Sequence, residues 1–238
     1  REAMSVSHND AMAWFENRRQ TYLRLSKAVA PYVDPSGTLF DVGGNIGYFT
    51  KILGETLDLS GVVHLFEPVP HLANLCRQTV AQLPFQAVVH EYGLSDRDET
   101  LDFYLAANGN LGWNTIIAAR TQDNMTRTQI QVREFDHCGV DAVPSLIKID
   151  VEGAEYRVLR GMLAALTRWD PRPPILCEVG WGSGHPNWDE EVAVFAELAD
   201  LGYRTFDLDG EPIDVGAIAK TTDVLFLPAH LAGATSHK

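Results

Sequence analysis

The chain has 238 residues, of which 45% are hydrophobic, and a formal net charge of −13 at pH 7. A chain of this size and composition can bury a substantial core, and we expect one large domain. The negative charge argues against a nucleic acid as the main partner, because nucleic-acid binding depends on Lys and Arg that neutralise phosphates. No apolar run reaches the roughly 18 residues that span a membrane, and no signal pattern stands at the N-terminus, so we expect a cytoplasmic protein.

The first predicted element is a helix over residues 9–32, which begins near Asn9 or Asp10 and ends before Pro35 and Gly37. We expect residues 1–37 to form a helical extension, either a lid or a brace, ahead of a domain over residues 38–238. From Leu39 onward, short β-rich runs alternate with helical patterns, which is typical of βαβ units. The fold class is therefore α/β, with a mostly parallel sheet flanked by helices. Seven strands are predicted, over residues 38–42, 62–67, 86–92, 145–150, 174–179, 203–208 and 223–228.

Four apolar stripes with helical spacing lie between these strands, near residues 48–53, 72–83, 158–166 and 192–199. Two alternating runs, residues 101–105 and 130–135, are predicted to pair as an inserted hairpin around a polar segment rich in Asn, Gly and Thr. A second irregular segment, GWGSGHPNW at residues 180–188, follows a predicted buried strand. We expect both irregular segments to form loops.

The first strand ends in a glycine turn, FDVGGNIGYFT. In an open α/β sheet the ligand crevice lies beyond the carboxyl ends of the strands, and glycines there let the backbone approach a ligand closely. Gly43, Gly44 and Gly47 stand at this point, but their spacing matches neither the dinucleotide fingerprint nor the phosphate-binding P-loop. Asp41 precedes them and would repel a pyrophosphate. The turn therefore favours a ligand that carries positive charge.

A second acid, Glu67, ends the next strand in HLFEPVP. A carboxylate at about this distance downstream commonly accepts both hydroxyls of a ribose. A ligand with a ribose, a positive charge and no phosphate is S-adenosylmethionine. The alternative is that Asp41 caps the following helix and Glu67 is merely solvated, but the two acids at matching strand ends favour the cofactor.

Four stretches, FDVGGNIGYFT, LFEPVP, YGLSDRDET and LIKIDVEGAEYRVLRGM, resemble the FkbM-type methyltransferases over roughly residues 38–179. The resemblance implies a class I Rossmann-like methyltransferase with a seven-stranded sheet, which moves a methyl group from S-adenosylmethionine. In this family the acceptor is usually a hydroxyl of a sugar, a polyketide or another small-molecule natural product. An N-methyltransferase, or a module of this fold that binds the cofactor without catalysis, is the alternative. A nicotinamide-dependent oxidoreductase is disfavoured by the glycine spacing.

The resemblance also implies which residues hold the cofactor. The turn from Asp41 to Gly47 would face its methionine part, Glu67 its ribose, and Leu94, Ser95 and Asp96 its adenine. Asn45 replaces the second glycine of the general pattern, as this family tends to have it. The expected cofactor-binding residues are Asp41, Gly43, Gly44, Asn45, Gly47, Tyr48, Phe49, Glu67, Pro68, Leu94, Ser95 and Asp150.

The stretch KIDVEGAE follows the fourth strand of the core pattern. Strand alternation sends Lys148 and Asp150 to the same side, where we expect them to pair. Asp150 would lie beside the sulfonium and orient the cofactor or the acceptor. Glu152 and Glu155 are expected to begin a helix, where acids favour the N-terminal dipole.

Methyl transfer to oxygen requires an in-line arrangement and removal of the hydroxyl proton. The expected catalytic residues are Asp150 together with two candidate bases near strand ends, His185 and Glu178; His137 is a further histidine near a loop. A divalent cation on Asp150 and Glu178 is an alternative chemistry, although two carboxylates do not specify a metal site. Oligomeric state and the identity of the acceptor have no sequence signal.

Tryptophans on the irregular segments are candidates for the acceptor site. Trp113, Trp181 and Trp188 would stack on a sugar or cover a hydrophobic acceptor, with ordinary packing as the alternative. Trp14 and Trp169 are expected to pack against the fold.

Overall fold

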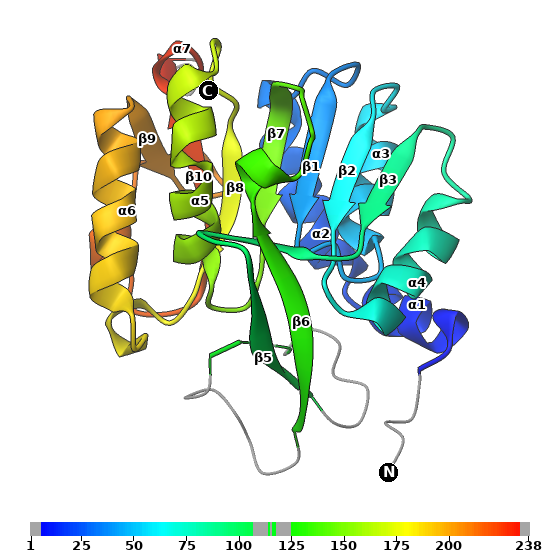
Figure 1. Cartoon of the computed structure of the whole chain (residues 1–238). Coiled ribbons are helices and arrows are strands. Elements are labelled where there is room, and N and C mark those ends of the chain that lie inside the picture. Colours follow the sequence, from blue (N-terminus) through cyan, green and yellow to red (C-terminus); the bar gives the residue numbers. More distant parts are fainter. Residues whose placement is uncertain (1–5, 107–113, 115, 118–124, 234–238) are drawn as a thin grey trace.

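The computed structural model of the chain describes residues 6–106, 114, 116–117 and 125–233. Its centre is a seven-stranded sheet in the order β3-β2-β1-β7-β8-β10-β9 (Figure 1). Only β10 runs antiparallel to its neighbours, so the predicted mostly parallel sheet is confirmed. Its strands are β1 (Thr38–Val42), β2 (Val63–Phe66), β3 (Ala87–His90), β7 (Pro144–Ile149), β8 (Ile175–Val179), β9 (Tyr203–Phe206) and β10 (Thr222–Pro228).

Helices cover both faces of this sheet. Helices α5 (Glu155–Arg168) and α6 (Trp188–Asp200) lie on the near face in Figure 1, and α2 (Arg19–Val29) and α3 (Tyr48–Leu57) lie on the far face. Successive strand residues divide between the faces: Phe40 packs with Met162 of α5, whereas Leu39 packs with Leu53 of α3. This alternation follows from the two-residue period of a strand. Helix α4 (Pro70–Val80) follows β2, and the short α7 (Ala229–Ala232) follows β10.

The N-terminal segment differs from the single helix predicted over residues 9–32. It forms α1 (His8–Glu16), which is capped by Ser7, and α2, with a break at Asn17 and Arg18. Phe15 of α1 packs with the helices beside the cavity, Leu25 of α2 packs beneath the sheet, and Tyr22 of α2 contacts both clusters. The two helices are separated at Arg18, which leaves the helical conformation with φ −113° and ψ 11°.

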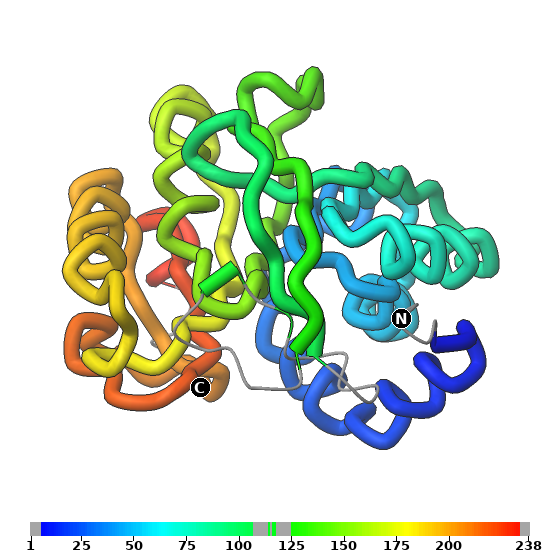
Figure 2. The backbone as a smooth tube through the Cα atoms, turned by 60° about the horizontal axis from the view of Figure 1, so that its bottom comes forward, coloured from blue at the N-terminus to red at the C-terminus, as the bar shows by residue number. Residues whose placement is uncertain are grey.

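The predicted hairpin is confirmed. Strands β5 (Glu99–Leu105) and β6 (Thr126–Glu134) pair antiparallel, with Leu101 opposite Ile130. A short strand that sequence patterns did not predict, β4 (Gly93–Ser95), pairs parallel with β6 and completes a second sheet in the order β4-β6-β5. Figure 2 shows the hairpin crossing the edge of the molecule at which the parallel strands end. The hairpin and α1 thus stand on the side of the sheet where ligands bind in such folds.

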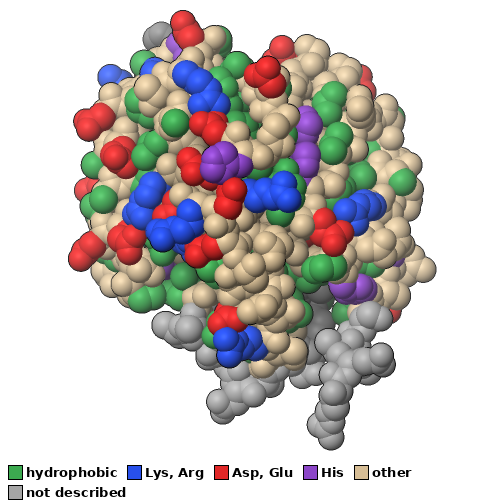
Figure 3. Space-filling model, viewed as in Figure 1, with side chains coloured by type: hydrophobic (Ala, Val, Ile, Leu, Met, Phe, Trp, Pro, Cys, Tyr) green, Lys and Arg blue, Asp and Glu red, His purple; other side chains and the backbone are tan. Residues whose placement is uncertain are grey.

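Charged side chains on the near face of the molecule alternate in sign, and Figure 3 shows Lys and Arg interspersed with Asp and Glu there. Ion pairs connect α5 to its neighbours, with Arg157 2.9 Å from Asp96 and Arg168 2.5 Å from Asp136.

Within the described residues, no helix is both long and apolar enough to cross a membrane.

Candidate active site

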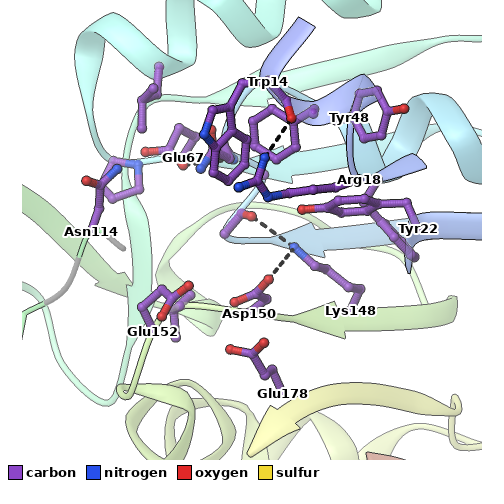
Figure 4. Close-up of a pocket in the computed structure, with 18 of the residues that line it drawn as sticks. Trp14, Arg18, Tyr22, Tyr48, Glu67, Asn114, Lys148, Asp150, Glu152 and Glu178 are labelled. Atoms are coloured by element: carbon purple, nitrogen blue, oxygen red, sulfur yellow. Dashed lines mark hydrogen bonds and ion pairs between the residues drawn. The ribbon is translucent and has the colours of Figure 1, made fainter. Parts of the chain in front are cut away.

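A cavity of about 550 Å³ opens where β1, β2, β7 and β8 end (Figure 4). This volume lies within the range of about 300–1,000 Å³ that is usual for small-molecule sites. The described structure brings together most of the residues that sequence analysis selected. Those that line the cavity are Gly43, Gly44, Asn45, Tyr48, Phe49, Glu67, Pro68, Asp150 and Glu178.

The glycine turn has a backbone conformation that side chains disfavour. Gly43 has φ +81°, and a Cβ atom there would lie 1.9 Å from the carbonyl oxygen of Asp150. Gly47 has φ +79°, and Asn45 has φ +48°. The N–H groups of Gly43 and Gly44 both donate to the carbonyl of Phe66 at 3.0 Å, which anchors the turn to the end of β2. The turn therefore presents backbone rather than side chains to the cavity.

Glu67 is held rigidly at the cavity wall. One carboxylate oxygen accepts the N–H of Asn45 and the other accepts the N–H of Val69, each at 2.9 Å. Burial raises the pKa of Glu67 to about 7, although these N–H groups and Lys148 favour the ionised form. Each carboxylate oxygen retains a further lone pair. The side chain is therefore placed to accept hydroxyl groups of a bound ligand.

Asp41 was expected to face the cofactor, but it lies beneath the cavity and not in it. Its carboxylate is buried, accepts a hydrogen bond from Thr50 at 2.8 Å, and lies 3.1 Å from Nζ of Lys148. Lys148 also donates to the carbonyl of Gly43 at 3.0 Å. The expected pair between Lys148 and Asp150 is present at 4.0 Å, so it is the longer of the two ion pairs. Asp41 thus supports the turn through Lys148 and does not meet a ligand directly.

Three carboxylates gather on the opposite wall of the cavity. Oxygens of Asp150, Glu152 and Glu178 lie within 4.8 Å of one another. Repulsion from Asp150, together with burial, raises the pKa of Glu178 to about 10. One buried carboxylate oxygen of Asp150 accepts no hydrogen bond from the described residues. Such a cluster attracts a positive charge, whether a sulfonium, an ammonium or a metal ion.

The turn before α5 separates two acids that were both expected at the start of that helix. Glu155 does begin α5, and its buried carboxylate accepts the N–H groups of Val151 and Gly153. Glu152 instead precedes the helix with φ +56° and lines the cavity. Only Glu155 therefore has the helix-terminal role that the pattern predicted for both.

A small recess of about 40 Å³ adjoins the main cavity, with which it shares Gly43 and Pro68. The two residues expected near adenine, Leu94 and Ser95, are buried in β4 and line this recess. Asp96 is turned away and bonds the guanidinium of Arg157. Leu94 and Ser95 therefore remain candidates for contact with adenine, whereas Asp96 does not line the recess.

His185 lies outside the cavity, which corrects its selection as a catalytic base. The residue is 3% exposed, its Nδ1 accepts the N–H of Asn187 at 2.9 Å, and its Nε2 lies 2.7 Å from the carbonyl of Gly153. Because Nδ1 accepts a hydrogen bond, Nε2 carries the proton and donates a hydrogen bond to the carbonyl of Gly153. Neither nitrogen is open to a substrate. His137 is exposed and bonds Asp98 at 2.9 Å, away from the cavity lining.

The tryptophan that lines the cavity is not one of those that sequence analysis selected for the acceptor site. Trp181 and Trp188 make ring contacts inside the fold and do not line the cavity. Trp169 is buried in the core as expected, whereas Trp14 lines the cavity. Trp113 lies outside the described residues.

Several cavity residues were missed by sequence analysis: Arg18, Tyr22, Asn114 and Thr221. They come from the N-terminal helices, the insertion and the loop before β10, none of which carries a glycine or strand-end signal. Burial and the neighbouring carboxylate of Asp150 raise the pKa of Tyr22 well above its usual value. Polar groups thus reach the cavity from three separate segments.

Comparison with known proteins gives a family match that includes the glycine turn and the strands from β2 to β8. The model of the methyltransferase FkbM domain matches residues 41–205. The hexuronic acid methyltransferase AglP of Haloferax volcanii is 32% identical over 131 residues, covering 54% of this chain and 51% of that protein. Methyltransferase 1 of Beauveria bassiana is 31% identical over 159 residues, covering 56% and 61%. The matched region therefore spans about half to three-fifths of these relatives.

Solved structures agree with this match. The methyltransferase FkbM of Methylobacillus flagellatus superimposes with a TM-score of 0.54 and 18% identity, covering 81% of this chain and 44% of that one. A putative rRNA methylase of Clostridium thermocellum has a TM-score of 0.51 and 10% identity, covering 84% and 91%. At these identities the likeness concerns the fold, and it confirms the predicted class I methyltransferase architecture.

Proposed function

Because the chain belongs to the FkbM methyltransferase domain family, we propose that it transfers a methyl group from S-adenosylmethionine to an oxygen of a small-molecule acceptor. The observation that carries the proposal is the position of Glu67, which is fixed by two backbone N–H groups at the wall of the cavity beside the glycine turn. A carboxylate held in this way suits the two hydroxyls of a ribose.

The rest of the cavity fits the same cofactor. The backbone of Gly43 and Gly44 would face the methionine part, the recess beside Leu94 and Ser95 would take the adenine, and Asp150 would face the positive charge. The buried oxygen of Asp150 that accepts no hydrogen bond from the described residues supports this assignment. When bound, S-adenosylmethionine supplies an electrophilic methyl group on a sulfonium.

The acceptor we propose is a sugar or a glycosylated natural product. The name of the Haloferax relative, a hexuronic acid methyltransferase, supports a sugar acid as one member of this class. The lining of Tyr22, Asn114 and Thr221 offers polar contacts for hydroxyl groups, and Trp14 offers an aromatic face. We further propose that residues 1–37 cover the acceptor side, since α1 and α2 supply Trp14 and Tyr22.

We propose that the cluster of Asp150, Glu152 and Glu178 removes the proton of the acceptor hydroxyl. With a pKa of about 10, Glu178 holds a proton at neutral pH while no cation is present. A sulfonium beside the cluster favours the ionised carboxylates by direct attraction. Glu178 therefore becomes a base when the cofactor is bound, which couples proton removal to the presence of the methyl donor.

A divalent cation on Asp150, Glu152 and Glu178 is a second candidate for the charge that this cluster holds, supported by the close approach of their oxygens. A metal ion would polarise the acceptor oxygen. Methyl transfer in the presence of excess chelator tests this point: activity that persists contradicts the metal, and activity that returns only with Mg²⁺ or Mn²⁺ supports it.

Calorimetric titration of the full chain with S-adenosylhomocysteine tests the cofactor assignment. We expect Glu67→Ala to weaken binding by about 10- to 100-fold, because a charged acceptor of two hydroxyl groups is lost. The matched control is Glu91→Ala, since Glu91 is exposed, bonds Arg77 and lines no part of the cavity. Equal affinities in the two variants would remove Glu67 from the site.

Transfer of a labelled methyl group to a panel of hexuronates, neutral hexoses and amines tests the reaction. Products methylated on oxygen support the proposal, products methylated on nitrogen support an N-methyltransferase, and cofactor binding without any product supports a non-catalytic module.

A further inference from the structure

Arg18 is a cation that the N-terminal helices bring to the cavity. It lies in the connection between α1 and α2, and its guanidinium stands 3.4 Å from the centroid of the Trp14 ring. One terminal nitrogen donates to the backbone carbonyl of Trp14 at 2.9 Å (Figure 4). Stacking and the hydrogen bond together fix the plane of the guanidinium over the mouth of the cavity.

Within the described residues, Arg18 has no carboxylate in ion-pair range, although the chain carries a large excess of acids. Its nearest acidic neighbour in the sequence, Glu16, pairs instead with Arg19 at 3.6 Å and Lys51 at 3.8 Å. The other cation of the cavity, Lys148, is paired below it. Arg18 is therefore the cavity-lining cation whose charge the described structure leaves uncompensated.

Among the described residues, none but Trp14 bonds the edge of this guanidinium, which is therefore available to a ligand. Arginine has five N–H donors in one plane, and the carbonyl of Trp14 uses one of them. Stacking on the indole occupies a face of the group and leaves its edge free. A guanidinium edge can bond a carboxylate through two parallel hydrogen bonds, which are shorter and stronger than hydrogen bonds between neutral groups.

The charges of the cavity favour the same kind of ligand. Asp150, Glu152 and Glu178 line one wall, where an anion is repelled, and Arg18 stands apart from them on the N-terminal helices (Figure 4). A molecule with a carboxylate at one end and a positive charge or hydroxyl groups at the other is oriented by this separation.

We propose that Arg18, stacked on Trp14, forms a carboxylate-binding subsite of the cavity. The inference rests on the proposed function, which supplies two sources for the carboxylate: the methionine end of the cofactor, and the acid group of a sugar acid acceptor. Residue 18 precedes the residues matched by the family model. The subsite is accordingly a feature of this chain's N-terminal segment.

Three probes distinguish the two sources when titrated into the full chain. S-adenosylhomocysteine carries the methionine carboxylate, 5′-methylthioadenosine has the same adenosyl thioether without the amino-acid end, and D-glucuronate carries the acid group of a sugar. The variants are Arg18→Ala and Arg18→Lys. The matched control is Arg24→Ala, because Arg24 lies on α2, pairs with the exposed Asp209 and does not line the cavity.

If the cofactor supplies the carboxylate, Arg18→Ala weakens S-adenosylhomocysteine binding by about 10- to 100-fold and changes methylthioadenosine binding by less than about twofold. If the acceptor supplies it, S-adenosylhomocysteine binding is unchanged and the affinity for glucuronate falls by a similar factor. Arg18→Lys should retain part of the affinity, since it keeps the charge and loses the forked geometry.

Affinities for all three probes that match those of Arg24→Ala would overturn the inference, and so would an equal loss for S-adenosylhomocysteine and methylthioadenosine. Failure of the unmodified chain to bind either nucleoside contradicts the proposed function instead. In that case the glucuronate titration alone decides the role of Arg18.

Discussion

Asp41 and Lys148 face each other across the β1–β7 pair, with Nζ of Lys148 3.1 Å from a carboxylate oxygen of Asp41 and both side chains almost fully buried. Lys148 also bonds the carbonyl of Gly43, so this ion pair supports the floor of the glycine turn. A buried charge pair of this kind costs desolvation when it forms, and the loss of one partner leaves the other charge uncompensated.

The first prediction concerns this pair. Asp41→Asn should lower the free energy of unfolding by about 3–5 kcal/mol, because Lys148 would remain buried without its closest counter-charge. Urea unfolding followed by circular dichroism measures the change. The double variant Asp41→Asn/Lys148→Met should recover a large part of the loss, since it removes both charges. A single variant that loses less than about 1 kcal/mol would mean that Asp150 suffices to compensate Lys148.

Gly43→Ala should both destabilise the fold and weaken cofactor binding. The new Cβ would meet the carbonyl oxygen of Asp150 at 1.9 Å, in a backbone conformation with φ +81°. We expect a loss of about 2–4 kcal/mol from strain and overpacking together. Gly139→Ala is the control for backbone strain, because Gly139 has φ +67° and a Cβ there would meet no atom within 4 Å. Equal losses of stability in the two variants would show that the contact with Asp150 relaxes.

The seven strands of the main sheet were predictable because each is a short apolar run between glycine, proline or polar breaks, and such signals are local; the three-residue β4 was too short to give one. Glu67 and the glycine turn were predictable for the same reason, since a parallel strand end is recognisable within a few residues. The pairing of Asp41 with Lys148 was not, because it depends on the register between two strands far apart in the sequence. Strand alternation therefore predicted the Lys148–Asp150 contact and missed the shorter one.

Local sequence patterns also failed to predict which of the candidate catalytic side chains face the cavity. His185 lies in a loop after a buried strand, which is a favourable place for a base, but the carbonyl of Gly153 and the N–H of Asn187 hold its ring inside the fold. Arg18 and Trp14 line the cavity from the end of α1 and from its connection to α2. Neither outcome follows from residue spacing, because both depend on how distant elements pack.

The burial of His185 leads to a prediction about catalysis. His185→Asn should lower stability by about 1–3 kcal/mol, because it disturbs two buried hydrogen bonds. The dependence of kcat on pH should nevertheless keep the same shape as in the unmodified chain, since the ring does not face the cavity. A folded variant that loses the acidic limb of the pH profile would return His185 to the list of bases.

The raised pKa of Glu178 makes the stability of the fold depend on pH. The folded chain without ligand binds a proton on Glu178 up to a pKa of about 10, whereas the unfolded chain releases that proton near the ordinary value of 4.5. Since the folded state binds more protons between these values, stability falls as pH rises through this window. Glu178→Gln removes the ionisable group and should raise the free energy of unfolding at pH 8 by about 1–3 kcal/mol.

The gain should vanish below pH 4, where the carboxyl is neutral in both states, and denaturant titrations at pH 4 and pH 8 measure the difference. Glu197→Gln is the control, because Glu197 is exposed on α6 and should show no dependence of this kind. The same Glu178→Gln variant should lose methyl transfer, because an amide cannot take the acceptor proton. If Glu178→Gln is more stable at pH 8 but inactive, then repulsion within the acid cluster destabilises the fold, and the same carboxylate is needed for methyl transfer. Unchanged stability would mean that Lys148 or bound cations already neutralise the cluster in the free protein.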